Sequence, residues 1–398
     1  MGSKDKTTVY EAKATDKNGS LREIINTTII IIVMIMYALT FFVPKFYGAT
    51  YPYVSLFVFA ILVILLFVNV NPIKALKNKE FDIYLLGILL FITGINLIIV
   101  DSGKGAFFSV ADFALIFYLS GKSILNDKQI KLISFMYLVL MVIWLLFVYP
   151  KLFADYTQYG YNTNTAATFT IYSMLCAFIF VEILHEKYEI AGLLMVIILL
   201  KGFQLSLWHR ARGAFIMLIL FMIFRFVIPK KWWANKVLYG LLCFFSTIGS
   251  LMFVMLYVYV GSKGVNFQMP FFYKNIFSGR DEIWYEFFSL FIKKPLTGIG
   301  TNVTIESFFE FNVHNAMYNY LVIHGLPVFI GILILIFIRL LKFRAQIVNN
   351  RVAMTAMCAL MAVFFESFFD VDLIWADYAL NLLFLLCCMG RIDENGKV

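Results

Sequence analysis

Residues 24–43 read IINTTIIIIVMIMYALTFFV and contain no charged side chain. About 20 apolar residues in a helix cross the roughly 30 Å hydrocarbon core of a bilayer, so this stretch predicts a transmembrane helix. Eleven further runs of this kind follow along the chain. The twelve predicted spans lie near 24–43, 52–70, 82–100, 105–121, 131–149, 166–184, 190–208, 212–229, 237–261, 316–339, 352–370 and 373–390.

The composition of the whole chain agrees with this interpretation. Of its 398 residues 62% are hydrophobic and 14% are charged, whereas soluble domains average about 45–50% and about 25%. So few charges cannot cover a water-exposed surface of this size. We therefore expect an all-α, polytopic membrane protein. The cysteines lie within apolar runs with no metal-ligand or disulfide spacing, which is typical of small packing residues; they are Cys176, Cys243, Cys358, Cys387 and Cys388.

The basic residues predict the orientation. With an even number of spans both termini share a side, and placing them in the cytoplasm puts 22 of the 33 Lys and Arg residues inside and leaves 11 outside. This agrees with the positive-inside rule, so the net charge of +9 is mainly a topology signal and not a nucleic-acid surface. The predicted parts are a cytoplasmic tail (1–23), nine spans (24–260), an external loop (261–315), three spans (316–390) and a cytoplasmic tail (391–398).

The external loop contains the pattern of one short amphipathic helix. Ser278 is a candidate N-cap, and the aromatic stripe that begins at Trp284 is typical of a helix lying on the bilayer surface. Arg280 falls in the first helical turn, where free backbone N–H groups favour anions. The plainer interpretation is that Arg280 pairs with a neighbouring acid or a lipid phosphate.

The external loop ends at a histidine. We expect Asn312 to cap the next helix and His314 to lie in its first turn, where the imidazolium form is disfavoured and a neutral ring can accept a proton. A histidine at a membrane interface can equally be a structural hydrogen-bonding residue.

Two arginines and a polar loop face the same side. Arg210 and Arg212 lie at the outer end of predicted spans, against the positive-inside bias, and arginine is suited to bidentate contacts with phosphate. The alternative is simple contact with lipid headgroups. In the loop at 150–165, Tyr161, Asn162 and Asn164 have the side chains that bind sugars, although tyrosine is also expected at an interface.

Taken together, these motifs resemble the O-antigen polymerase and O-antigen ligase family, the Wzy-like membrane glycosyltransferases of GT-C type. The resemblance covers roughly residues 160–340, and the first five spans match only in hydropathy. Ala211 stands where serine is commoner in the family. The matching motifs are Asn162-Thr163-Asn164, Arg210-Ala211-Arg212-Gly213-Ala214, Ser278-Gly279-Arg280, Trp284, Pro295-Leu296-Thr297-Gly298-Ile299-Gly300, His314-Asn315 and Gly325.

The resemblance implies a polymerase for capsule or exopolysaccharide in the bacterial plasma membrane. It would join repeat units linked to a polyprenyl (undecaprenyl) diphosphate on the outer face and release the lipid diphosphate. A flippase and a chain-length regulator are the implied protein partners, beside the lipid-linked substrate and membrane lipids. No cytosolic nucleotide site is evident, so we expect no metal, no cofactor and no nucleic acid.

The same resemblance implies the roles of individual residues. Arg212 and Arg280 would stabilise the departing diphosphate, and His314 would take the proton of the acceptor hydroxyl. Residues expected to bind or orient substrate are Arg210, Asn315, Asn164, Asn162, Trp284 and Tyr161.

Three alternatives to a polymerase remain open. A ligase would transfer the glycan to a different lipid or acceptor. A transporter would use ionisable residues within the spans, for which Asp112, Lys201, Glu366 and Asp377 are candidates. A peptidoglycan polymerase of the shape–division family would need an external acid, and its motif is not found around Glu306 or Glu310.

Overall fold

The structure of the protein is a computed structural model that describes residues 4–122, 124–148, 163–265, 267–272, 275–306 and 312–390. Its regular elements are helices, and one isolated antiparallel bridge joins Gln268 to Asn275 within the described residues. The α-helices are α1 Lys4–Phe42, α2 Pro44–Thr50, α3 Val54–Asn69, α4 Pro72–Lys77, α5 Phe81–Ile99, α6 Lys104–Ser120, α7 Asp127–Ile143, α9 Thr163–His185, α10 Ala191–Trp208, α11 Arg212–Met222, α12 Lys230–Ala234, α13 Lys236–Thr247, α14 Gly249–Gly261, α15 Arg280–Phe291, α16 Ala316–Asn349, α17 Arg351–Glu366 and α18 Ala379–Met389.

These helices make the chain an all-α, multi-pass membrane protein. Within the described residues, seven helices are long and apolar enough to cross a membrane, or eight if α13 and α14, bent by 50°, count as one span. The predicted runs near 105–121, 212–229, 352–370 and 373–390 are helical too, but α6, α11, α17 and α18 are each shorter than 18 residues. The number of twelve spans therefore stays a prediction.

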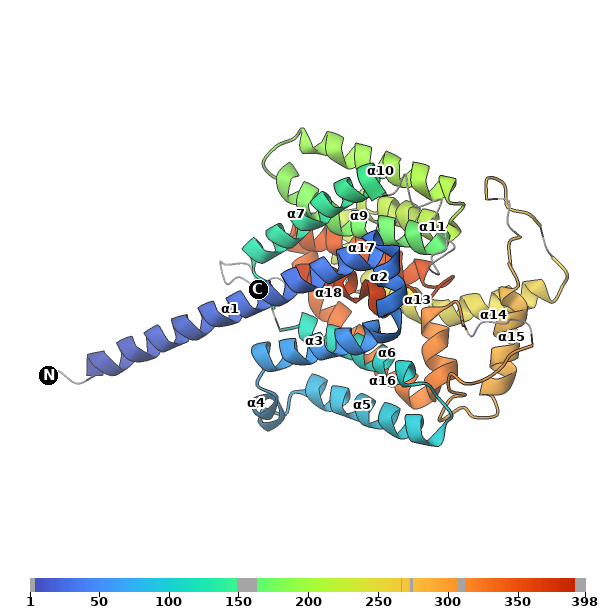
Figure 1. Ribbon diagram of the computed structural model, residues 1–398, viewed down its shortest axis with the longest axis horizontal. Helices are drawn as coiled ribbons and strands as arrows, with labels where there is room; N and C mark the ends of the chain where they lie inside the picture. The colour runs from blue at the N-terminus through green and yellow to red at the C-terminus, as the bar shows by residue number, and fades with distance from the viewer. Residues whose placement is uncertain are drawn as a thin grey trace.

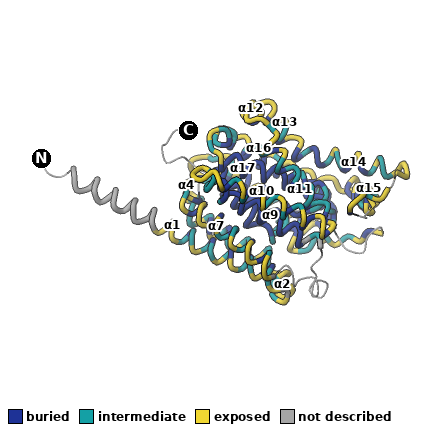
Figure 2. Tube along the Cα trace, turned by 90° about the horizontal axis from the view of Figure 1, so that it is seen from above, coloured by how far each residue is buried: buried dark blue, intermediate teal, exposed yellow. Residues whose placement is uncertain are grey.

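The shorter helices lie at the centre of the bundle. Nearly every residue of α17 and α18 is buried, whereas α1, α3 and α5 expose many large apolar side chains. Figure 2 shows the buried residues gathered in the middle of the molecule. Small residues recur every third position along α17, from Ala353 to Ala362, and let neighbouring helices approach closely. The exposed apolar faces of the outer helices are the surface expected to meet lipid.

The N-terminal end of α1 and the helices α14 and α15 lie at opposite ends of the molecule (Figure 1). Helix α1 begins at Lys4, so the predicted N-terminal tail is helical and continuous with the first span. The predicted C-terminal tail, 391–398, lies outside the described residues.

Helix α16 is broken at Gly325, which has φ 81° and ψ 171°. The segment 295–300 runs alongside this break: the Ile299 N–H donates to the Val322 carbonyl at 2.9 Å, and the Gly300 N–H donates to the Ile323 carbonyl at 3.1 Å. A Cβ at Gly325 would lie 2.3 Å from the Leu296 carbonyl oxygen. The glycines of the Pro295–Gly300 motif and Gly325 therefore serve the same purpose. They let two backbone segments come into contact at a place where a side chain cannot fit.

The amphipathic helix of the external loop is present as α15, with two corrections. Its N-cap is Gly279 in a left-handed conformation, and Ser278 makes no capping bond. Most of its apolar stripe packs against protein: Trp284, Phe287 and Phe291 are buried, with α14 and α16 as the packing partners. Phe288, the fourth residue of the stripe, is exposed.

The start of α16 also differs from the sequence-based prediction. The N-cap is Asn315, whose side-chain oxygen accepts from the Tyr318 N–H at 2.9 Å, and the helix begins at Ala316. Asn312 instead accepts from the His314 N–H at 2.9 Å. His314 therefore precedes the helix, with a positive φ of 51°, and does not lie in its first turn. Two asparagines in this stretch can cap, and the backbone conformation at 314 decides between them.

Candidate functional site

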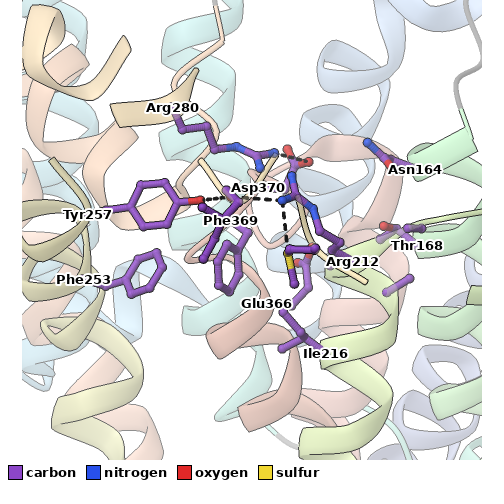
Figure 3. Close-up of a pocket in the computed structure, with 15 residues that line it drawn as sticks. Asn164, Thr168, Arg212, Ile216, Phe253, Tyr257, Arg280, Glu366, Phe369 and Asp370 are labelled. Atoms are coloured by element: carbon purple, nitrogen blue, oxygen red, sulfur yellow. Dashed lines mark hydrogen bonds and ion pairs between the residues drawn. The ribbon is translucent and has the colours of Figure 1, made fainter. Parts of the chain in front are cut away.

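A cavity of about 220 Å³ lies where several helix ends meet. The starts of α9, α11 and α15 and the ends of α14 and α17 all contribute to it, so residues from about 164 to 370 converge on one hollow (Figure 3). We call it the basic cavity after Arg212 and Arg280. Its lining is Asn164, Thr168, Ala211, Arg212, Gly213, Ala214, Ile216, Phe253, Tyr257, Met269, Ile276, Arg280, Glu366, Phe369 and Asp370.

Arg212 joins α11 to the external loop. It is the first residue of α11, and its Nη1 donates to the carbonyls of Asn275 at 2.9 Å and Ile276 at 3.0 Å. Its Nη2 donates to the Ser278 hydroxyl at 2.7 Å. The fixed fork of a guanidinium can hold several acceptors at once, which an ammonium cannot do in the same geometry. Arg212 therefore holds the loop at the rim of the cavity.

Arg280 is less engaged than Arg212. It is the first residue of α15, only 13% of its side chain is exposed, and its Nη2 lies 3.9 Å from Asp370 Oδ2. Its buried Nε has no hydrogen-bond partner in the structure. A buried donor without a partner costs about 1–3 kcal/mol, so Arg280 is poised to donate to an anion that enters the cavity.

Asp370 connects Arg280 to His314. One carboxylate oxygen faces Arg280, and the other lies 3.5 Å from Nδ1 of His314. Burial on its own would raise the pKa of Asp370, but the hydrogen bond and charge of His314 and the charge of Arg280 hold this pKa below its ordinary value. Asp370 is therefore an anion that orients the imidazole and balances the arginine.

A second pair of acids lies beside Asp370. Glu366, the last residue of α17, is 1% exposed and lines the cavity, and its Oε2 has no hydrogen-bond partner. Burial and the negative charge of Asp370 raise the pKa of Asp372 well above its ordinary value. The surroundings of Asp372 therefore disfavour its charged form.

The first turn of α11 also faces the cavity. Ala211, its N-cap, has extended backbone and no hydroxyl, so its side chain makes no capping hydrogen bond to the first N–H groups. The residues from Ala211 to Ala214 line the hollow. A Cβ at Gly213 would lie 2.6 Å from Oε1 of Glu366, so only glycine lets this acid approach the helix start. Exposed N–H groups at a helix start favour an anionic ligand.

The structure brings together some of the predicted site residues. Arg212, Arg280 and Asn164 line the basic cavity, and His314 reaches it through Asp370. Arg210 is exposed and does not line the cavity. Tyr161 and Asn162 lie outside the described residues.

Two other predicted site residues, Trp284 and Asn315, are buried in the structure and do not line the cavity. Trp284 is fully buried, and its Nε1 donates to the Val313 carbonyl at 2.7 Å, which fixes the segment before His314. Asn315 is fully buried, and its amide donates to the Phe368 carbonyl at 3.0 Å while its oxygen accepts from Ser250 at 2.8 Å. Neither side chain lines the cavity. Each instead holds a backbone segment next to the site in place, and so supports the site.

Sequence reasoning did not single out Asp370 for the site, and it named Glu366 only as an ionisable residue within a predicted span. Both occur in the stretch FFESFFDVD, 364–372, where acids interrupt an apolar run at the outer end of a predicted span. Ionisable residues in such a place mark functional sites, so this signal was readable. Within the described residues no group of three or more His, Cys, Asp or Glu side chains could hold a metal ion.

The fold and the cavity define a class: a multi-pass helical membrane protein with a basic cavity between its helix ends. Comparison with protein-family models, with curated proteins and with solved structures found no match for this chain.

Proposed function

We propose that the protein is a membrane glycosyltransferase that polymerises oligosaccharide repeat units carried on a polyprenyl diphosphate. The observation that carries this proposal is the basic cavity itself, in which Arg212 and Arg280 meet beside a His314–Asp370 pair. Arg212, Arg280 and His314 are the catalytic residues that the resemblance to the O-antigen polymerase family implies, whereas Asp370 comes from the structure alone. Nearly 70 residues separate the two arginines along the chain.

The proposed reaction begins with a diphosphate in the basic cavity. The bond between the sugar anomeric carbon and the diphosphate oxygen breaks, and the departing lipid diphosphate gains negative charge. Arg280, with its unpartnered Nε, and the N–H groups at the start of α11, which Ala211 does not cap, stabilise that charge. Arg212 supplies further positive charge while it holds the loop.

The acceptor is a sugar hydroxyl on a second lipid-linked unit. Its oxygen attacks the anomeric carbon, and its proton passes to the imidazole of His314. Asp370 holds the ring through Nδ1, which leaves the other ring nitrogen for the hydroxyl. A positioned base of this kind contributes about 10²–10⁴ in rate.

The finer topology belongs to the same proposal. Twelve spans with both termini in the cytoplasm put the basic cavity on the outer face of a bacterial plasma membrane. A flippase would deliver the lipid-linked units to that face, and a chain-length regulator would act on the growing polymer.

Purified protein in vesicles, supplied only with lipid-linked repeat units, tests the proposal. We expect a ladder of polymers for the wild type, and a loss of about 10²-fold or more in rate for Arg280→Ala and for His314→Ala. Lys293→Ala, which removes an exposed positive charge from the loop beyond α15, is the matched control and should keep full activity.

The same assay separates the alternatives. A ligase would give single transfers to an added acceptor lipid and no ladder, and a transporter would give neither product. Wild-type ladders that persist in both cavity variants, with normal insertion of each, would show that the site is wrongly assigned.

A further inference from the structure

A second cavity, of about 180 Å³, lies near the opposite end of the loop that joins α17 to α18. The loop residue Asp370 faces the basic cavity, and Asp377, in the 3₁₀ turn Ala376–Tyr378, faces the second cavity. Helices α1 and α3 form its other walls. The lining residues are Val33, Met36, Tyr37, Thr40, Thr50, Tyr53, Val54, Phe57, Val58, Ala376, Asp377 and Leu380.

This cavity continues as an apolar groove between the same helices. A smaller hollow of about 30 Å³ shares Val33, Phe57, Val58 and Leu380 with it and reaches Leu65. Along α1 the two hollows run from Ile29 to Thr40, which is about 16 Å at the rise of an α-helix. A long, narrow, apolar groove that faces the hydrocarbon fits a lipid chain better than it fits a compact solute.

The polar end of the groove carries a carboxylate that lacks a donor. Oδ1 of Asp377 is buried and has no hydrogen-bond partner in the structure. The nearby hydroxyls do not serve it, because Thr40 donates to the Met36 carbonyl at 2.8 Å and Thr50 donates to the Phe46 carbonyl at 2.7 Å. The hydroxyl of Tyr37 is paired with Ser173 at 2.6 Å. A ligand must therefore bring the donor.

The charge at this end selects among lipids. None of the described residues that line the cavity is Lys, Arg or His. An anionic headgroup would meet the Asp377 carboxylate with no compensating cation, whereas an ammonium group offers three donors and a positive charge. This is the reverse of the basic cavity, where two arginines favour phosphate.

We propose that this groove binds a phospholipid whose headgroup carries a primary amine. One acyl chain lies along α1 and α3, and the ammonium group donates to Asp377. The site does not depend on the proposed glycosyl transfer, since a membrane protein of any activity could hold such a lipid.

Native mass spectrometry of the full-length protein tests the site, with phosphatidylethanolamine or phosphatidylglycerol of identical chains added. We expect the wild type to retain the amine lipid in preference, and Asp377→Asn to lose roughly tenfold in affinity for it while its binding of phosphatidylglycerol is unchanged. Leu380→Trp fills the groove and should abolish the specific adduct. Leu56→Trp, at an exposed position of α3 outside the groove, is the matched control and should keep the adduct.

Three results would overturn the proposal. These are equal retention of the two lipids by the wild type, unchanged amine-lipid binding in Asp377→Asn, or an adduct that survives Leu380→Trp. A preference for phosphatidylglycerol would show that the groove takes an anionic lipid instead. If Leu380→Trp fails to insert, Val58→Trp blocks the groove from the opposite wall, and the same readout applies.

Discussion

Arg280 and Arg212 both place a guanidinium in the basic cavity, but they differ in the hydrogen bonds that each already makes. Arg212 already donates to two carbonyls and a hydroxyl of the external loop, whereas Arg280 has one weak ion pair and a buried Nε without a partner. A donor that lacks a partner gains more from an incoming anion than one that must first give up its bonds. At the residue scale, Arg280 is therefore the stronger candidate to bind an anion in the cavity.

Gly213 is a second residue at which adding a single Cβ atom should disturb the site. In Gly213→Ala the new Cβ would lie 2.6 Å from Oε1 of Glu366, so that buried acid or the first turn of α11 must move. We expect about a tenfold loss of polymerising rate at unchanged membrane level, because charges at the reacting centre shift. Gly240→Ala is the matched control, since a Cβ there meets nothing within 4 Å. Equal rates for the two variants would contradict this prediction.

Asp370 gives a prediction about pH. Because its folded-state pKa lies below the ordinary value, this carboxylate stabilises the fold above about pH 4 and loses that contribution as the pH falls through the folded pKa. In Asp370→Asn this acid-dependent part is absent. Thermal unfolding in detergent from pH 7 to pH 3 should therefore show a smaller acid loss of stability in the variant than in the wild type. Parallel curves would show that Asp370 is not ionised in the folded protein.

At the scale of elements, the external loop depends on the side chain of Arg212. Arg212→Lys keeps the charge but cannot reach Asn275, Ile276 and Ser278 together. We expect the loop around 268–278 to become several-fold more sensitive to an added protease, with a parallel loss of activity. Protease sensitivity is compared with that of Lys263→Ala, a neighbouring exposed residue at the base of the loop. A lysine variant with wild-type resistance and rate would indicate that only the charge matters.

The break in α16 is the second element on which the site depends. Gly325 has φ 81° and ψ 171°, a backbone conformation essentially confined to glycine, and lies against the Leu296 carbonyl, so Gly325→Ala combines backbone strain with a clash. The conformation alone costs about 1–3 kcal/mol. We expect a lower thermal unfolding temperature and less protein in the membrane. Gly94→Ala, in the middle of α5 with nothing within 4 Å of its Cβ, should be neutral or slightly stabilising.

At the scale of the whole molecule, the orientation in the membrane can be measured. The five native cysteines are all buried, so an impermeant maleimide should label the wild type only weakly. Lys263→Cys, beside the external loop, should react in intact cells, and Lys187→Cys, in the turn between α9 and α10, only after the membrane is opened. Both positions are exposed in the structure. The reverse pattern would place the basic cavity in the cytoplasm and refute the proposed function.

The sequence alone determined the class of protein and the positions of most of its long helices. Apolar runs near 20 residues predict spans because helix length and burial in lipid are local properties. The amphipathic helix α15 was predicted from its aromatic stripe, which is also a local pattern. Arg212, Arg280 and Asn164 were also found from the sequence, since charged or amide residues at the outer ends of spans are conspicuous. The break at Gly325 was marked by a motif, but no local pattern of residues explained it.

The tertiary structure alone decided which residues meet. Asp370 joins Arg280 to His314, and Trp284 and Asn315 turn inward as supports, because five helix ends pack around one hollow. It also decided that Asn315 and not Asn312 caps α16, and that three of the four stripe residues of α15 are buried against protein. Such choices depend on contacts between residues far apart in the chain, whose energies no local pattern of residues contains.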